Sequence, residues 1–537
     1  MTSGEGDLTT DVLVIGAGAS GAIASTYLIQ QGIQVLCLEQ GEWPDASKFV
    51  GRRAERELIA HPRFSPNPNV RQGEADYPVE ATESDVDPVM YNAVGGSTVL
   101  WTGFWHRLLP SDFRVRSLDG VAADWPLSYD ELAPEYDEVE AAVGVSGLAG
   151  DPAYPPRGPY PLPPFPLGRM GMRFVEGMNR LGWHWWPGTN AIPSRPYRRL
   201  NACVRRGTCI TGCADGAKAS MDITHWPDAI AAGARLITGA RVREITIDPA
   251  GRANGAVYVD RAGRECRVRA SVVVMCANGI GTPRLLLLSQ SGRFPKGLAN
   301  SSGLVGRGLM LHPTALASGV VDEPMETWLG PMGQTVNSMQ FYETDRSRGF
   351  VRGSKWSLAP NGGPLGIAAA LPVHGAELQH AMRATYGHML TIAVFAEDLP
   401  EENNQVTLDD ELTDSDGIPA PRIRYRVGEN TRKLIDFNLA RAREALEAAG
   451  TKSVFTLPVQ RDFGGAHLMG SARMGNDPER SVVDKWGRCH DVPNLYIFDA
   501  SVFVTSGAVN PTGTICALAL RFARQLARER HSIRGAA

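Results

Sequence analysis

The sequence predicts an α/β fold, in which a domain of parallel strands and helices is interrupted by an inserted α+β domain built on an antiparallel sheet. Three observations indicate this. An apolar strand, a glycine turn and a helical pattern follow one another at the start of the chain and again near residue 280. Residues 405–408 and 421–426 alternate like antiparallel strands, and residues 429–449 form a long amphipathic pattern. A last apolar strand at 494–499 and a helical pattern at 511–530 return to the first domain.

The first element is a strand that runs into a glycine turn within residues 11–21. Gly16 permits the tight turn, Gly18 lets the backbone approach a pyrophosphate, and Gly21 lets the following helix pack on the strand. Glu39 ends the next apolar strand, where a carboxylate can accept hydrogen bonds from ribose hydroxyls. A plain strand-turn-helix unit can imitate such a motif. Here, however, the strand before the turn, the helix after it and the acidic residue at the expected interval all fit dinucleotide binding. We therefore expect a Rossmann-like dinucleotide-binding unit.

The middle of the first domain is less regular. Residues 62–88 are rich in Pro and Asn, and Gly95 and Gly96 form a second glycine turn. We expect a helix over 124–144, strands over 235–247, 256–259 and 267–276, and then a helix with Pro283 in its first turn. The expected units are a first domain made of 1–150, 201–319 and 458–537, a connecting and lid-like segment at 151–200, and a substrate-binding domain at 320–457.

Composition excludes several classes of protein. The chain has 537 residues and a formal net charge of −4, so it can hold more than one domain and has no positive field that favours nucleic acid. No apolar run is long enough to span a bilayer, and the start has no signal-peptide pattern. Eight cysteines in so long a chain do not form a disulfide scaffold. We expect a cytoplasmic protein without a membrane span.

Several motifs in a fixed order carry a family resemblance. Residues 16–21 with Glu39, the turn at 94–97, and residues 279–292 and 305–313 are followed by a C-terminal block at 467–475, 499–503 and 510–512. Together they resemble the glucose-methanol-choline (GMC) family of FAD-dependent oxidoreductases over most of the chain. The pattern is similar to the branch that includes pyranose oxidases, glycoside 3-oxidases and the flavoprotein subunits of gluconate and related sugar dehydrogenases.

The resemblance implies FAD as cofactor and assigns roles to individual residues. His467 stands at the position of the catalytic base and Asn510 at that of a second polar group on the substrate oxygen. Leu100 stands where a histidine links FAD covalently in some pyranose oxidases, so we expect non-covalent FAD. No metal ligand is expected. The implied cofactor contacts are Gly16, Gly18, Ser20, Gly21, Glu39, Gly95, Gly96, Ser97, Val242, Asp499, Pro511 and Thr512.

The chemistry of alcohol oxidation suits the pair His467 and Asn510. The hydroxyl proton must be removed as hydride leaves the same carbon, so a base and a flat acceptor are needed on opposite sides of one atom. A neutral His467 can take the proton while Asn510 donates to the developing alkoxide. We expect oxidation of a CH–OH group, foremost a secondary hydroxyl of a sugar, glycoside or polyol. Oxygen, a quinone or a partner protein would accept the electrons. His312 is expected to brace its loop.

Two alternatives and two local ambiguities stay open. Cys203, Cys209 and Cys213 resemble the iron–sulfur ligands of some sugar dehydrogenase subunits, so the chain could be an electron-transfer subunit with a small partner or an oligomer. Buried inert thiols are the simpler interpretation. A non-redox lyase on the same fold is the other alternative. The aromatic run at 183–186 suits either a sugar ring or core packing.

Overall fold

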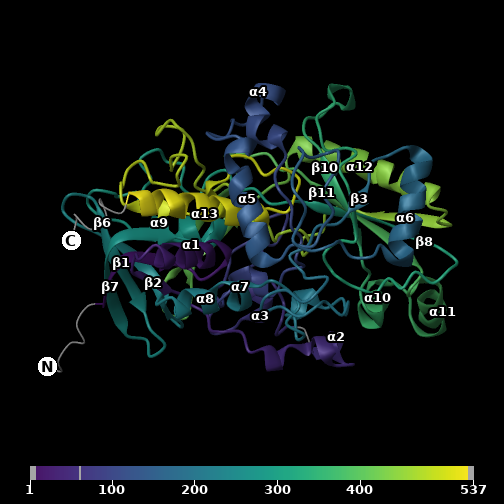
Figure 1. Ribbon diagram of the computed structural model, residues 1–537, viewed down its shortest axis with the longest axis horizontal. Coiled ribbons are helices and arrows are strands. Elements are labelled where there is room, and N and C mark those ends of the chain that lie inside the picture. Colours follow the sequence, from purple (N-terminus) through teal and green to yellow (C-terminus); the bar gives the residue numbers. More distant parts are fainter. Residues whose placement is uncertain (1–7, 60–61, 530–537) are drawn as a thin grey trace.

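The computed structural model describes residues 8–59 and 62–529, and within them two sheets lie side by side (Figure 1). The first has the strand order β4-β2-β1-β7-β6-β5, with β15 also paired to β7. The second, antiparallel sheet has the order β14-β8-β11-β10-β9-β3. The α/β fold with an inserted domain on an antiparallel sheet is therefore confirmed.

The first sheet is parallel at its centre. Its long strand β7 pairs with β1 on one side, and its two halves pair with antiparallel β6 and parallel β15 on the other. Apolar residues bury this sheet against α1, α9 and α13. The bounds are β1 Leu8–Ile15, β2 Val35–Leu38, β4 Arg235–Ile237, β5 Arg241–Ile247, β6 Ala253–Val259, β7 Glu265–Met275, β15 Leu495–Ile497, α1 Ala19–Gln30, α9 Asn278–Leu288 and α13 Thr512–Arg528.

The second sheet packs against α6 and α12 (Figure 1). Its strand β3 comes from the segment expected to be a connection, and β8 begins before residue 320, so this sheet draws on more of the chain than residues 320–457. The bounds are β3 Trp186–Pro187, β8 Thr314–Val320, β9 Val336–Ser338, β10 Ser354–Ala359, β11 Met389–Ala396, β14 Ser453–Leu457, α6 Gly168–Leu181 and α12 Glu429–Ala448.

Two expected strands form a separate hairpin. β12 Gln405–Thr413 and β13 Pro419–Arg424 form a two-stranded sheet, and the hairpin packs on α9 of the first domain. Val406 and Ile423 join the apolar cluster there. The remaining α-helices lie in the connections between strands: α2 Arg56–Ile59, α3 Pro68–Arg71, α4 Val115–Asp119, α5 Tyr129–Val143, α7 Met221–Thr224, α8 Trp226–Ala231, α10 Pro364–Ala370 and α11 Gly375–Thr385.

Three local expectations were wrong. Residues 235–247 are two strands, because the chain turns at Gly239 with φ +62° and leaves β4 paired in parallel with β2. The helix expected from residue 124 begins at Tyr129, where Ser128 caps it. Pro283 lies inside α9 rather than in its first turn. Pro283 has no N–H group, so it cannot donate the usual helix bond to the carbonyl of Gly279. The Ser471 hydroxyl donates to that carbonyl instead, at 2.6 Å.

Candidate active site

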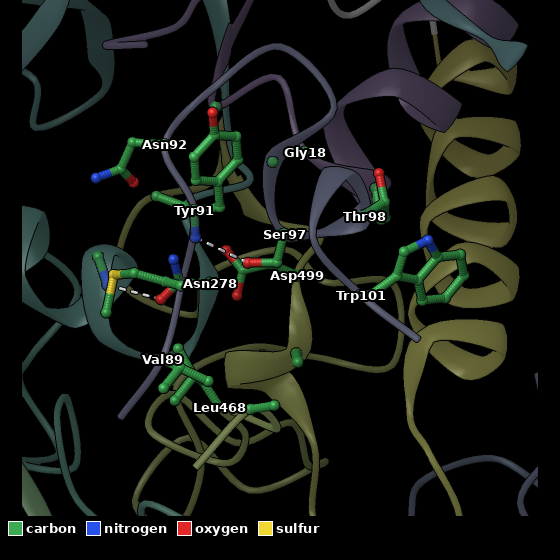
Figure 2. A pocket seen from close by; sticks show the side chains of 18 of the residues that line it. Gly18, Val89, Tyr91, Asn92, Ser97, Thr98, Trp101, Asn278, Leu468 and Asp499 are labelled. Carbon is green, nitrogen blue, oxygen red and sulfur yellow. Dashed lines mark hydrogen bonds between the residues drawn. The ribbon is translucent and has the colours of Figure 1, made fainter. Parts of the chain in front are cut away.

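A cavity of about 550 Å³ lies between the first glycine turn and the C-terminal block. Figure 2 shows Gly18, Ser97 and Asp499 on its walls. His467 and Asn510 line the same cavity. Of the twelve residues implied as cofactor contacts, all reach the cavity except Gly21 and Gly95. The structure therefore brings together residues that are almost 500 positions apart.

Three glycines of the two turns lie so close to neighbouring backbone that a side chain would collide with it. Gly16 has φ +104°, and a Cβ there would lie 2.4 Å from the carbonyl oxygen of Cys276. A Cβ on Gly96 would lie 2.9 Å from the Cα of Gly18, so the two glycine turns approach each other closely. A Cβ on Gly21 would lie 2.0 Å from the Gly16 carbonyl oxygen, which gives Gly21 the predicted helix-packing role.

The start of α1 completes this cradle. No side chain caps the helix at Gly18, and no acidic residue stands in its first turn. Its first N–H groups and the positive end of its dipole are thus available to an anion. A Cβ on Gly18 would meet only Gly96, at 4.0 Å. These features fit the pyrophosphate of a dinucleotide such as FAD.

Glu39 stands at the end of β2 with its carboxylate fixed. Its Oε2 accepts from the N–H of Ala17 and its Oε1 from the N–H of Gly41, both at 2.8 Å. Burial raises the pKa of Glu39 to about 7, against the lowering effect of these backbone donors. The spare lone pairs of this buried carboxylate suit ribose hydroxyl donors, as the sequence predicts.

Asp499 and Ser97 hold the cavity walls in place. Asp499 accepts from the hydroxyls of Thr282 at 2.5 Å and Ser501 at 2.6 Å, so it ties α9 to the C-terminal block. Burial raises its pKa. The Ser97 hydroxyl accepts from the N–H of Tyr91 at 3.2 Å (Figure 2). Asp499 and Ser97 therefore shape the cavity as well as line it.

His467 belongs to a chain of hydrogen bonds that defines its tautomer. The Nε2 of His312 lies 2.7 Å from the carbonyl oxygen of Gly507. Because a carbonyl only accepts, this Nε2 carries the proton of neutral His312, and its Nδ1 is an acceptor. The Nδ1 of His467 lies 2.8 Å from that acceptor and must donate to it. The lone pair of His467 is then on Nε2, 3.2 Å from the Nδ2 of Asn510.

The electrostatics keep His467 neutral. Burial lowers its pKa well below the ordinary value, and the charged forms of His312 and Lys355 lower it further. Burial also lowers the pKa of His312 to about 4. With both imidazoles neutral, the Nε2 of His467 is the proton acceptor at the cavity wall. His312, expected only to brace its loop, therefore directly orients the candidate base.

Lys355 is a neighbour that the sequence analysis missed. It lies on β10, and its Nζ donates to the Oδ1 of Asn510 at 2.5 Å. Its Nζ is 4.4 Å from the ring centroids of both Phe104 and Phe395. Burial lowers the pKa of Lys355 well below its ordinary value. No sequence pattern identifies Lys355 as a residue of the site, because a lysine in a strand normally faces solvent.

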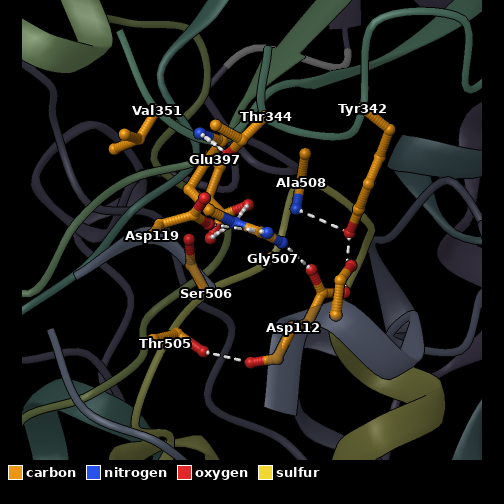
Figure 3. Close-up of polar contacts among 12 residues, drawn as sticks. Asp112, Asp119, Tyr342, Thr344, Val351, Glu397, Thr505, Ser506, Gly507 and Ala508 are labelled. Carbon is orange, nitrogen blue, oxygen red and sulfur yellow. Dashed lines mark hydrogen bonds and ion pairs between the residues drawn. The ribbon is translucent and has the colours of Figure 1, made fainter. Parts of the chain in front are cut away.

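The loop that carries Asn510 is anchored by a buried ion cluster (Figure 3). The Thr505 hydroxyl donates to the carbonyl of Asp112 at 2.8 Å. The N–H of Ala508 donates to the Tyr342 hydroxyl at 3.0 Å, and that hydroxyl donates to the Asp112 carboxylate at 2.8 Å. Arg352 in turn contacts the carboxylates of Asp112, Asp119 and Glu397. The loop is thereby pinned to both domains.

Burial affects two of the three thiols in the cysteine triplet. Cys203, Cys209 and Cys213 are all free, and burial raises the pKa of Cys203 to about 11. Burial raises the pKa of Cys209 as well. Within residues 8–59 and 62–529, no group of three or more His, Cys, Asp or Glu side chains is placed to hold a metal ion.

The aromatic run at 183–186 packs instead of lining the cavity. The Trp183 ring meets Phe341 edge-on at 5.0 Å and Trp356 at 6.1 Å, inside the core of the second sheet. The His184 Nε2 lies 2.8 Å from a carboxylate oxygen of Asp151. A sugar-stacking role for this run is not supported.

In the part of the chain that the structure describes, no helix combines the length and the apolar character needed to cross a membrane.

Known proteins resemble this chain over most of its length. Two family models described as GMC oxidoreductase match residues 10–314 and 400–519. The chain is 43% identical to 2-methyl-1,2-propanediol dehydrogenase of Mycolicibacterium austroafricanum, over 95% of this chain and 94% of that protein. It is 32% identical to the fructose dehydrogenase large subunit of Gluconobacter japonicus, over 96% and 97%, and 31% identical to paromamine 6'-oxidase of Streptomyces fradiae, over 97% and 92%.

Solved structures share the fold. The crystal structure of pyridoxine 4-oxidase from Mesorbium loti superposes with a TM-score of 0.64 at 19% identity, covering 96% of this chain and 99% of that one. A formate oxidase gives a TM-score of 0.65 at 15% identity, covering 98% and 99%. At these identities the likeness establishes the architecture.

Proposed function

The chain belongs to the GMC oxidoreductase family, and on this premise we propose that His467 is the base with which it oxidises a CH–OH group in an FAD-dependent reaction. One observation carries the proposal. The lone pair of His467 Nε2 and the amide N–H group of Asn510 lie 3.2 Å apart at the wall of the cavity that the glycine turns form. A base and a hydrogen-bond donor thus lie side by side, and the donor has a second N–H group for a substrate oxygen placed next to the base.

The residues present fit FAD. The turn at Gly16 and Gly18 with the start of α1 would hold the pyrophosphate, and Glu39 would hold the ribose. Residues 96–98 and 510–512 with Asp499 would lie against the ring system. Bound FAD supplies the acceptor for the hydride that leaves the substrate carbon.

The protein side chains control the proton. His467 Nε2 takes the hydroxyl proton of the substrate, and Asn510 Nδ2 donates to the oxygen as negative charge develops there. The imidazolium that forms keeps its Nδ1–H on His312, whose Nε2–H is held by the Gly507 carbonyl. His467 therefore stays in one orientation while it changes charge.

The proposed substrate is a small polyhydroxylated molecule: a sugar, glycoside or polyol, with a secondary hydroxyl as the favoured reacting group. The names of relatives support a small polyhydroxylated substrate, since they include a propanediol dehydrogenase, a fructose dehydrogenase and a paromamine oxidase. In 2-methyl-1,2-propanediol the tertiary hydroxyl has no hydride to give, so only the primary hydroxyl can be oxidised, and the test must include primary hydroxyls beside secondary ones. Phe104, Ile210 and Phe463 line part of the cavity, so an apolar face on the substrate would be accommodated there.

The test is anaerobic bleaching of the bound flavin by a panel that contains 2-methyl-1,2-propanediol, fructose, gluconate, methyl glycosides and simple alcohols. His467→Ala should retain its yellow colour and reduce its flavin at least about a hundredfold more slowly. An undiminished rate in folded His467→Ala would overturn the assignment. Bleaching by substrate also excludes the lyase alternative. Admission of air, then of a quinone, identifies the acceptor.

We also propose that FAD is bound without a covalent link and that the protein works in the cytoplasm. Leu100, at the position of the linking histidine, lines the cavity and has no nucleophilic atom. Acid precipitation should release the yellow chromophore into the supernatant, and a yellow pellet would contradict this. All eight cysteines are free, which suits a reducing compartment.

A second candidate is a subunit of an electron-transfer complex. The name of one relative, a large subunit, favours it. Iron analysis and the hydrodynamic mass of anaerobically purified protein test it: absence of iron and a mass that fits this chain alone or its simple multiples would exclude it.

A further inference from the structure

Lys355 is buried in a place where it does little for the fold. Its side chain is 0% exposed. Among the residues that the structure describes, no carboxylate forms an ion pair with it, and its hydrogen-bond acceptor is the amide oxygen of Asn510. A buried amine without a carboxylate costs more free energy than one hydrogen bond returns. Its presence is therefore explained better by function than by stability.

The surroundings of Lys355 restrict where its N–H groups can point. Phe104 and Phe395 lie on it with their ring centroids 4.4 Å from Nζ, and they can accept a cation but no conventional hydrogen bond. The charged form of Lys355 lowers the pKa values of three titratable groups that face it, His106, His312 and His467. Among the residues that the structure describes, Asn510 is the one conventional hydrogen-bond partner of the Lys355 side chain.

An asparagine amide is nearly symmetric, so its oxygen and nitrogen can exchange places unless neighbours distinguish them. Lys355 Nζ is the donor in its contact with Asn510, so the amide oxygen faces Lys355. The amide nitrogen must then face His467 Nε2 and the cavity. The wrong orientation would present a second oxygen to the substrate oxygen and repel it as it becomes an alkoxide.

We propose that Lys355 is a positioning residue for the oxidation, which holds the Asn510 amide with its N–H group directed at the substrate oxygen. This inference rests on the proposed function of His467 and Asn510. Lys355 acts through Asn510 and touches neither substrate nor the reacting atoms. A hydrogen bond at Oδ1 also polarises the amide, so its N–H becomes a stronger donor toward developing negative charge.

The first test compares Lys355→Met with Lys355→Gln in the FAD-loaded protein. Methionine keeps the length of the side chain and suits the two phenyl rings, but it cannot donate; glutamine restores a neutral donor. Using the panel substrate that bleaches the flavin fastest, Lys355→Met should lower kcat about tenfold or more with little change in KM. Lys355→Gln should recover part of kcat. The exposed Lys452, changed to Met, is the matched control and should leave both parameters unchanged.

Thermal unfolding separates positioning from structural support. Removal of an unpaired buried amine should leave the melting temperature of Lys355→Met unchanged or higher, while kcat falls. A variant that is equally active, or one whose lower kcat follows only from a lower melting temperature and lost FAD, would overturn the inference. If Lys355→Met does not fold, Lys355→Gln enters the same comparison.

The decisive test is a double-mutant cycle with Asn510→Ala. If Lys355 acts through Asn510, the Lys355→Met change should alter kcat by less than about twofold once Asn510 is alanine. Equal fold-losses in both backgrounds would refute the inference. Failure of the base assignment gives a different result, because His467→Ala would then reduce its flavin at the normal rate whatever the cycle shows.

Discussion

Replacement of His312 by alanine should slow flavin reduction while FAD stays bound. His312 is fully buried and lies behind His467, away from the cavity lining. The variant loses the 2.8 Å contact that holds His467 Nδ1. His467 then keeps no partner that selects its tautomer or supports the imidazolium that forms when it takes the substrate proton.

The magnitude follows from the single bond that is lost. A hydrogen bond to a group that becomes charged contributes about 1.5–3 kcal/mol. Since 1.36 kcal/mol corresponds to a factor of ten in rate, the expected loss is roughly tenfold to 150-fold. The carbonyl of Gly507 also loses its buried donor at 2.7 Å, which should lower the free energy of unfolding by about 1–3 kcal/mol.

The assay is anaerobic stopped-flow reduction of the bound flavin at saturating substrate, with FAD content checked by absorbance. His388→Ala is the matched control: the His388 ring is half-buried, and its Nδ1 contacts only a backbone carbonyl, that of Val321, at 3.2 Å. It should reduce its flavin within a factor of two of the unmodified rate. If folded, FAD-loaded His312→Ala also stays within that factor, the hydrogen-bond chain does not orient the base.

Three further changes probe the cradle, the anchor and the base. Gly16→Ala should lose FAD and have a lower melting temperature, because the added Cβ would lie 2.4 Å from a backbone carbonyl oxygen. Gly32→Ala is the control: φ there is +75° and the space around the added Cβ is open, so this variant should bind FAD normally. Arg352→Leu should cost about 3–5 kcal/mol, measured by urea unfolding. Burial raises the pKa of Asp112 to about 6 and that of Glu397 to about 8, and Arg352 opposes both shifts. Without Arg352 the two carboxyls keep their protons to higher pH, so the Arg352→Leu deficit should widen above about pH 6 and further above about pH 8. Because burial lowers the pKa of His467, and this base acts when neutral, kcat/KM should fall on the acid side only below pH 6.5, as a pH profile will show.

Local geometry could be predicted from the sequence because it depends on few residues. The positive φ of Gly16, the packing of Gly21 and the place of Glu39 at a strand end all follow from one strand-turn-helix unit. His467 and Asn510 were assigned by resemblance, and the structure places them together. Their mutual distance depends on the whole fold, so spacing along the chain could not give it.

One wrong prediction and one open question share a physical cause. β4 joins the parallel sheet because its neighbour β2 is available, although its sequence continues smoothly into β5. For Trp183 the sequence left a choice between ligand contact and core packing, and its edge contacts with Phe341 and Trp356 show that it packs in the core. In each case a tertiary neighbour decides between two local possibilities that the sequence leaves equally open.

The polar contacts around the base also depend on tertiary neighbours, because they come from both domains. His467 and Asn510 come from the C-terminal block, His312 precedes β8, and Lys355 lies on β10 of the second sheet. The orientation of the base and of the amide is therefore complete only when the two domains are docked. The Arg352 cluster, which links β10 and β11 to the loop before Asn510, lies at that junction. Weakening the cluster should thus disturb the alignment of the amide before it unfolds either domain, because the hydrogen bonds to Asn510 cross the junction while the core of each sheet does not.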